Sequence, residues 1–149
     1  MMIDESRNLV RRSFEDAPRN SNICDEIFAS SFLFQAIQHI KMPTTESDPQ
    51  SEKAACEELA ATWYADWRIV IDEMIAEGDR VVSRLVWRGT HRGEWKLGVY
   101  GPVQPTGASF AVAAVNIVRI AEGRIAEEWE TFDWLGLARQ LGEIVPPGA

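Results

Sequence analysis

The chain has 149 residues, 46% of them apolar, and a formal net charge of -8 at pH 7. This length and composition suit one globular domain, which we expect to span residues 1–149. The negative charge argues against nucleic acid or an anionic membrane surface as the main partner. No apolar run has the length of a membrane span, and the first residues lack the apolar stretch of an export signal, so we expect a cytoplasmic protein. In that compartment the two cysteines, Cys24 and Cys56, are expected to be buried thiols rather than a disulfide.

The first part of the chain has the periodicity of helices. Apolar residues recur on one stripe over residues 2–14, and a second, shorter helix is predicted over residues 23–28. The pair Ser30-Ser31 is expected to stop that helix. Residues 32–37 fit either a buried strand segment or another helical turn. Residues 41–47, with a proline and two threonines, are predicted to form a loop.

A longer helix is predicted over residues 49–64. Asp48 is a favoured N-cap residue, and Pro49 suits the first helical position because its missing N–H has no helical partner there. Charged residues on one side of this helix, Glu52 among them, indicate a solvated face.

The second half of the chain changes to a period of two, which is typical of strands. Strands are predicted over residues 67–75, 81–88, 109–120 and 123–133, and a last helix over residues 135–141. Helices followed by an antiparallel meander indicate the α+β class. We expect a curved antiparallel sheet of four to five strands, wrapped around helices to form a cone. Such a cone encloses an apolar pocket, which is the default ligand site.

The last predicted strand ends at Asp133. Alternation puts this carboxylate on the same face as Trp129, with Glu128 and Glu130 pointing the other way. Among aromatic groups a carboxylate has a raised pKa, because desolvation disfavours its charged form, and it can then act as a general base toward a carbon acid. Alternatively, Asp133 only caps the helix that follows. The spacing leaves both interpretations open.

Three motifs stand out in this half of the chain: the run Ile75 to Val82, the triplet Gly89-Thr90-His91, and the closing pattern from Gly123 through Trp129 and Asp133 to Gly142. Together they resemble the SnoaL-like polyketide cyclases. The resemblance implies a cystatin-like cone of the nuclear-transport-factor and ketosteroid-isomerase type, usually a homodimer. It also implies a lyase or isomerase in which an aspartate deprotonates a carbon acid and an intramolecular aldol closure follows, without cofactor or metal. Asp133 stands where that aspartate falls.

Further residues are expected to complete the site. Asn116 is the polar residue best placed to orient Asp133 or to hold an oxyanion. The substrate is expected to contact Trp129, Trp63, Gln35, Arg84 and His91. Flat indole surfaces suit a small hydrophobic or aromatic ligand. A turn-stabilising role fits His91 as well, and the outer face of the sheet fits Arg84. Two isolated histidines, His39 and His91, do not make a metal site.

Two other functions suit the same fold. Epoxide hydrolysis in such a cone would need Asp72, Arg84 or Arg88, and Asp133 to converge on one water molecule. A small-molecule-binding module without catalysis would leave Asp133 merely structural. The fold alone does not choose among these functions. Because the strands carry apolar residues on both faces, we also expect a homodimer through the outer face of the sheet.

Overall fold

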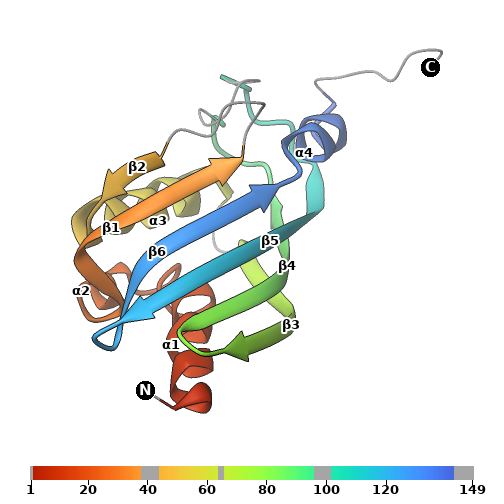
Figure 1. Ribbon diagram of the computed structural model, residues 1–149. Helices are drawn as coiled ribbons and strands as arrows, with labels where there is room; N and C mark the ends of the chain where they lie inside the picture. The colour runs from red at the N-terminus through yellow and green to blue at the C-terminus, as the bar shows by residue number, and fades with distance from the viewer. Residues whose placement is uncertain (1, 38–43, 64–65, 96–101, 143–149) are drawn as a thin grey trace.

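The computed structural model describes residues 2–37, 44–63, 66–95 and 102–142. In chain order the elements are α1 (Ile3–Glu15), a 3-10 turn (Ser21–Ile23), α2 (Cys24–Ile27), β1 (Phe28–Ile37), β2 (Thr44–Ser47), α3 (Pro49–Trp63), β3 (Arg68–Glu77), β4 (Arg80–Thr90), β5 (Ser109–Ala121), β6 (Arg124–Phe132) and α4 (Trp134–Gln140). Helices α1, α2 and α3 cover one face of a curved sheet, and none of these three lies on the opposite face (Figure 1). The predicted α+β class is confirmed.

The sheet has six strands in the order β2-β1-β6-β5-β4-β3. All neighbours are antiparallel except β1 and β6, which run parallel. The prediction of a purely antiparallel sheet with four to five strands is therefore wrong in these two details. Ser30-Ser31 lies within β1 and does not end a helix, because the backbone there belongs to a strand that pairs with β6 and β2. Of the predicted loop 41–47, residues 44–47 form β2, and residues 41–43 lie outside the described segments.

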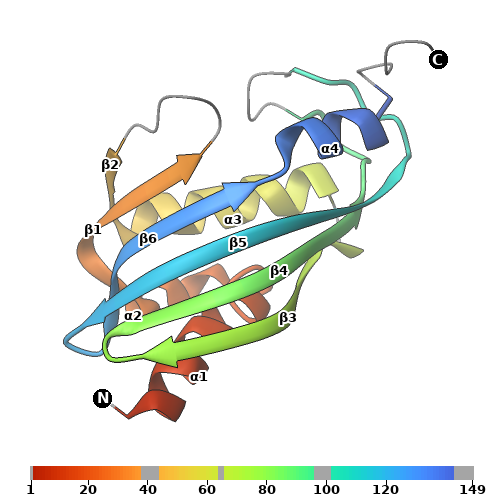
Figure 2. The same cartoon turned by 45° about the vertical axis from the view of Figure 1, so that its right-hand side comes forward.

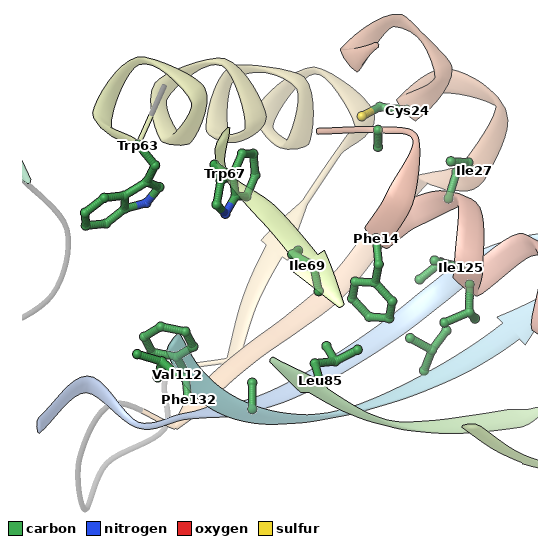
Figure 3. Close-up of a cluster of buried hydrophobic side chains, with 14 of the residues drawn as sticks. Phe14, Cys24, Ile27, Trp63, Trp67, Ile69, Leu85, Val112, Ile125 and Phe132 are labelled. Atoms are coloured by element: carbon green, nitrogen blue, oxygen red, sulfur yellow. The ribbon is translucent and has the colours of Figure 1, made fainter. Parts of the chain in front are cut away.

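Strand β5 shows most clearly how the sequence divides between the two faces of the sheet. Its side chains alternate without interruption, and every second one is buried: Phe110, Val112, Ala114, Asn116, Val118 and Ile120. These side chains face the helices, where Phe14 and Ile27 meet Leu85 and Ile125 from the sheet (Figure 3). Burial of such an apolar layer is the main stabilising contribution to a fold of this kind. Asn116 is the one polar member of this row.

A bulge in β6 decides which of its side chains face inward. Arg119 pairs with Glu127, but the next residue of β5, Ile120, pairs with Ile125, so Ala126 is an extra residue. An extra residue shifts the alternation of the strand by one position. Ile125 therefore faces the core before the bulge, and the even-numbered residues from 128 onward face it afterwards.

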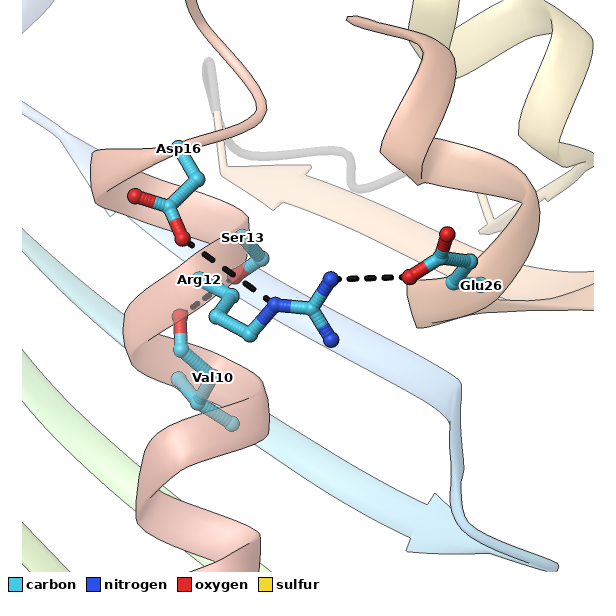
Figure 4. A network of polar contacts seen from close by, with 5 residues as sticks. All are labelled: Val10, Arg12, Ser13, Asp16 and Glu26. Carbon is cyan, nitrogen blue, oxygen red and sulfur yellow. Dashed lines mark hydrogen bonds and ion pairs between the residues drawn. The ribbon is translucent and has the colours of Figure 1, made fainter. Parts of the chain in front are cut away.

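The end of α1 is held to α2 by a polar network (Figure 4). Arg12 Nη2 lies 2.9 Å from Glu26 Oε2, and Arg12 Nε lies 4.0 Å from Asp16 Oδ2. The hydroxyl of Ser13 donates to the Val10 carbonyl oxygen at 2.7 Å. Exposed ion pairs stabilise a fold only weakly, so this network mainly fixes the position of the last turn of α1.

The predicted N-cap of α3 is confirmed, since the Ser51 N–H donates to Asp48 Oδ1 at 2.7 Å. Helix α3 crosses the inner face of the sheet (Figure 2). Both cysteines are thiols, as predicted. None of the helices in the described segments is long and apolar enough to span a membrane.

Candidate functional site

A cavity of about 300 Å³ lies between α1, α3 and the inner face of the sheet. Much of its wall is aromatic and comes from Phe14, Phe28, Phe34, Trp67, Trp87, Phe132 and Trp134. Rings within this wall contact one another: the Trp67 and Trp87 centroids are 5.7 Å apart, and Trp87 meets Phe132 edge-on at 5.2 Å. The size and the aromatic lining are typical of a site for a small organic ligand.

Three glutamates place carboxyl groups in the wall of this cavity: Glu52 from the first turn of α3, and Glu128 and Glu130 from β6. We call them the carboxyl cluster. The described residues of the wall include no lysine, arginine or histidine. The ionisable groups that meet a ligand are therefore acids, apart from the thiol of Cys56, whose pKa burial raises to about 12 and which stays protonated.

Asn116 links the cluster to the neighbouring strand. Its Nδ2 donates to Glu128 Oε1 at 2.7 Å, and in the sheet register Asn116 lies opposite Glu130. Asn116 and Glu128 are both buried. A hydrogen bond to a carboxylate favours the ionised form, so Asn116 opposes the effect of burial on Glu128.

Burial raises the pKa of every member of the cluster. The pKa of Glu130 is raised to about 8, first by desolvation and then by the charge of Glu128. Desolvation followed by the charges of Glu128 and Glu130 raises the pKa of Glu52, and desolvation raises that of Glu128. Because these groups interact, they titrate as a unit. The cluster therefore keeps protons at pH values where an ordinary glutamate has lost its own.

Asp133 lies outside this cavity. Its side chain is exposed, and its Oδ1 accepts a hydrogen bond of 2.8 Å from the Gly136 N–H at the start of α4. A Cβ at position 136 would collide with the carboxylate, so glycine there suits the cap. The prediction that Asp133 faces an enclosed apolar cavity is wrong, because the chain leaves the sheet after Phe132 and turns into the helix. The alternative interpretation, a helix cap, describes its position.

Trp129 and Gln35 also lie away from the cavity. They are neighbours in the parallel pairing of β1 with β6, on the face opposite Glu128 and Glu130. The Arg80 guanidinium lies 5.3 Å from the centroid of the Trp129 ring, a cation–π contact on the outer face. Neither side chain lines the cavity where their ligand contacts were predicted, since the bulge in β6 turns Trp129 outward.

Trp63 lies next to the cavity but does not line it. Trp63 is buried, but it lines a void of about 20 Å³ next to the cavity rather than the cavity itself. Trp87 and Phe132 border both spaces. Trp63 thus supports the cavity wall from behind.

Arg84 is exposed on the outer face, where its Nε lies 2.8 Å from Asp72 Oδ2 and its Nη2 lies 3.4 Å from Glu73 Oε2. Arg84 does not line the cavity, because β4 alternates and puts this side chain on the outer face of the sheet. Asp72, Arg84 and Asp133 do not meet in the cavity, and none of the residues named for epoxide hydrolysis, Arg88 included, lines it.

His91 is buried and holds a turn. The Thr106 N–H donates to His91 Nδ1 at 3.3 Å, and the Gly107 N–H donates to the His91 carbonyl oxygen at 2.8 Å. The imidazole packs 5.3 Å from the Trp63 ring. His91 does not line the cavity, and the turn-stabilising role describes its position. His39 lies outside the described segments, within which no group of three or more His, Cys, Asp or Glu side chains could hold a metal ion.

The carboxyl cluster is the part of the site that the sequence patterns missed. Glu52 was expected on a solvated face, and Glu128 and Glu130 on the face opposite the site. One signal pointed to the latter two: in the alternation they share a side with the apolar Phe132. Asn116, by contrast, was singled out in the sequence and does contact Glu128 of the cluster.

Residues 8–141 match the family of SnoaL-like polyketide cyclases. The chain belongs to this family. Since the match spans most of the chain, the resemblance seen in the sequence motifs is confirmed. No match was found among curated proteins.

Solved structures share the fold. TsrD from Streptomyces laurentii is 21% identical, with a TM-score of 0.76 over 97% of this chain and 99% of that chain. IdmH, a proposed polyketide cyclase from Streptomyces antibioticus, is 22% identical, with a TM-score of 0.73 over 92% of this chain and 98% of that chain. A nuclear-transport-factor-like protein of unknown function from Burkholderia pseudomallei is 20% identical, with a TM-score of 0.66 over 92% of this chain and 97% of that chain. At these identities the likeness shows the fold, and the expected cone is confirmed.

Proposed function

We propose that this SnoaL-like protein is an acid–base enzyme that removes a proton from the carbon next to a carbonyl group in a small, largely apolar substrate. The observation that carries the proposal is the pair Glu128 and Glu130, which faces an aromatic cavity while Asn116 holds Glu128 at 2.7 Å. This pair replaces Asp133 as the expected base.

The pair supplies both halves of proton transfer. Its ionised member accepts the proton from the substrate carbon, and the electrons of the C–H bond move onto the carbonyl oxygen. Its protonated member donates a hydrogen bond to that oxygen as charge develops there. Away from water such a donor is worth much more than in solution, because no solvent competes for the charge. The enolate then attacks a second carbonyl in the same molecule, closing a ring, or takes a proton back at another carbon.

The wall of the cavity defines the class of substrate. Aromatic rings offer flat apolar surfaces, and the charge-bearing groups of the described wall are carboxylates. A substrate carboxylate would be repelled there. We therefore propose a neutral, small hydrophobic or aromatic substrate.

The outer face of the sheet is proposed to bind a second copy of the chain. Leu33, Val70, Val115 and Ile117 are large apolar side chains that remain exposed on strands of this face. Exposed apolar residues spread over several strands of one face are consistent with a protein interface. The cavity opens on the other side of the sheet, so the proposed homodimer leaves the carboxyl cluster accessible.

Exchange of carbon-bound protons tests the enzymatic proposal without knowledge of the natural substrate. The probe is a neutral naphthyl ketone, in which two methylenes join naphthalene to an acetyl group, dissolved in D2O and followed by NMR. The protein should accelerate deuterium uptake next to the carbonyl, and the double variant Glu128→Gln, Glu130→Gln should lose a factor on the order of 10² to 10⁴. Glu58→Gln, which removes an exposed carboxylate of α3, is the control. Equal exchange by the double variant and the unmodified protein would rule out the pair as the base.

A further inference from the structure

Glu52 is the member of the carboxyl cluster that the proposed proton transfer does not use. It comes from α3, whereas Glu128 and Glu130 come from β6, so the acids line the cavity from its helix wall and from its sheet wall. Helix α3 lies across the inner face of the sheet (Figure 2). The pKa of Glu52 is raised by burial and by the charges of Glu128, Glu130 and Asp48, so its carboxyl group interacts with those of the sheet pair.

Three tryptophans of the cavity wall, Trp67, Trp87 and Trp134, carry indole N–H groups without a hydrogen-bond partner among the described residues, and Trp67 is the most buried of the three. Its side chain lines the cavity and is only 4% exposed, and its indole N–H has no hydrogen-bond partner among the described residues. Figure 3 shows the ring between α3 and the sheet, with its nitrogen on the side toward the sheet. A buried donor without a partner lowers the stability of the fold. An acceptor oxygen on a bound molecule would satisfy this N–H.

We infer that the site also expels water from neutral β-hydroxy ketones carried on an aromatic frame, with Glu52 protonating the departing hydroxyl group. The inference rests on the proposed function for removal of the α-proton by Glu128 and Glu130. A carboxylate of that pair takes the α-proton, the C–H electrons form the C=C bond, and the C–O bond breaks. The Glu52 proton joins the departing oxygen and water leaves. The cluster gains one proton and loses one, so no other reactant is needed.

The division of the acids between two walls is what points to elimination. Enolisation alone needs a base and a donor to one carbonyl oxygen, and the sheet pair provides both. Elimination also has to break the C–O bond. Glu52 on the helix wall can protonate the leaving hydroxyl group there, while the sheet pair takes the α-proton on the other side of the substrate. The Trp67 N–H supplies a donor for the ketone oxygen in the same arrangement.

The experiment uses the acetone aldol adduct of naphthaldehyde, a neutral β-hydroxy ketone whose dehydration gives a conjugated enone. Formation of the enone is followed by its near-ultraviolet absorbance, and the products are identified by chromatography. The same preparations are assayed for deuterium uptake by the saturated naphthyl ketone. Glu52→Gln is the test variant and Glu58→Gln, from the exposed side of the same helix, is the matched control.

The unmodified protein and Glu58→Gln should both dehydrate the adduct. Glu52→Gln should lose dehydration by a factor on the order of 10² or more relative to its own deuterium exchange, because exchange depends on Glu128 and Glu130 and dehydration also needs the Glu52 proton. Exchange without any dehydration by the unmodified protein would overturn the inference and leave the proposed function standing. So would dehydration by Glu52→Gln at the unmodified rate, or release of naphthaldehyde and acetone in place of the enone. Absence of both reactions would overturn the inference and the proposed function together.

Discussion

The side-chain amide of Asn116 donates a 2.7 Å hydrogen bond to the carboxylate of Glu128 on the adjacent strand. One strand thus provides a carboxyl group of the cavity wall, and its neighbour provides the amide that favours the charged form of that group. The relationship depends on the pairing of β5 with β6, because a shift of one residue would move Asn116 to the outer face.

Asn116→Ala should weaken both the fold and the chemistry. Loss of the amide leaves a buried carboxyl group without its donor, so the pKa of Glu128 should rise further and the free energy of unfolding should fall by about 1–3 kcal/mol at pH 8. Chemical denaturation at pH 5 and pH 8 measures this change, and the loss should be larger at the higher pH. Asn22→Ala, at an exposed asparagine, is the control. A loss that is the same at both values would show that Asn116 acts through packing alone.

The stability of the protein should fall as the pH rises from about 4.5 toward 8. Because the pKa of Glu130 is raised from its ordinary 4.5 to about 8, the folded chain binds more protons than the unfolded chain between these values. The free energy of unfolding is then highest below the lower value and decreases with pH until the upper one is passed. Glu130→Gln should gain about 1–3 kcal/mol over the unmodified protein between pH 4.5 and pH 8.5. Thermal unfolding of the unmodified protein and of Glu130→Gln across this pH range measures the difference. The same dependence of melting temperature on pH in both proteins would contradict the account.

Asp133 should behave as a helix cap. Asp133→Asn should change the free energy of unfolding little, since asparagine caps a helix about as well as aspartate, whereas Asp133→Ala should cost about 1 kcal/mol. Both variants should keep the deuterium-exchange activity, because the carboxylate accepts from the Gly136 N–H and lies outside the cavity. If Asp133→Asn folded normally but lost exchange activity, Asp133 would have to be restored as the base.

Ile117→Lys should convert the proposed homodimer into a monomer. Ile117 lies beside Trp129 on the outer face, where a lysine would place a charge within the proposed interface. Light scattering at micromolar concentration should show a dimer for the unmodified protein and for Leu135→Lys, which alters an exposed leucine of α4. A monomer in the unmodified protein would contradict the interface.

The sequence predicted most of the elements, because their signals are local. Asp48 capped its helix as expected, and Asn116 was found because β5 alternates without interruption. The pairing of β1 with β6 escaped prediction, since a parallel neighbour distant in the chain leaves no local pattern.

The face of β6 was assigned wrongly for a definite reason. Ile125 and Trp129 are apolar and both odd-numbered, so simple alternation puts them on the inward face of the strand. The same alternation puts the odd-numbered Asp133 on that face as well. The bulge at Ala126 breaks that parity, and a bulge is not visible in the alternation itself. Glu52 was assigned to the solvated face because a charged residue that lines a cavity and a charged residue that faces water give a helix the same sequence pattern.

The titration of the glutamate side chains tests the central claim most directly. NMR of protein with ¹³C-labelled glutamate carboxyl groups follows each group through the pH range. We predict a resonance that titrates near pH 8 and is absent from Glu130→Gln, together with further glutamates whose pKa lies above the ordinary value. Titration of every glutamate near the ordinary 4.5 would show that the cavity does not desolvate its acids, and would contradict the acid–base account.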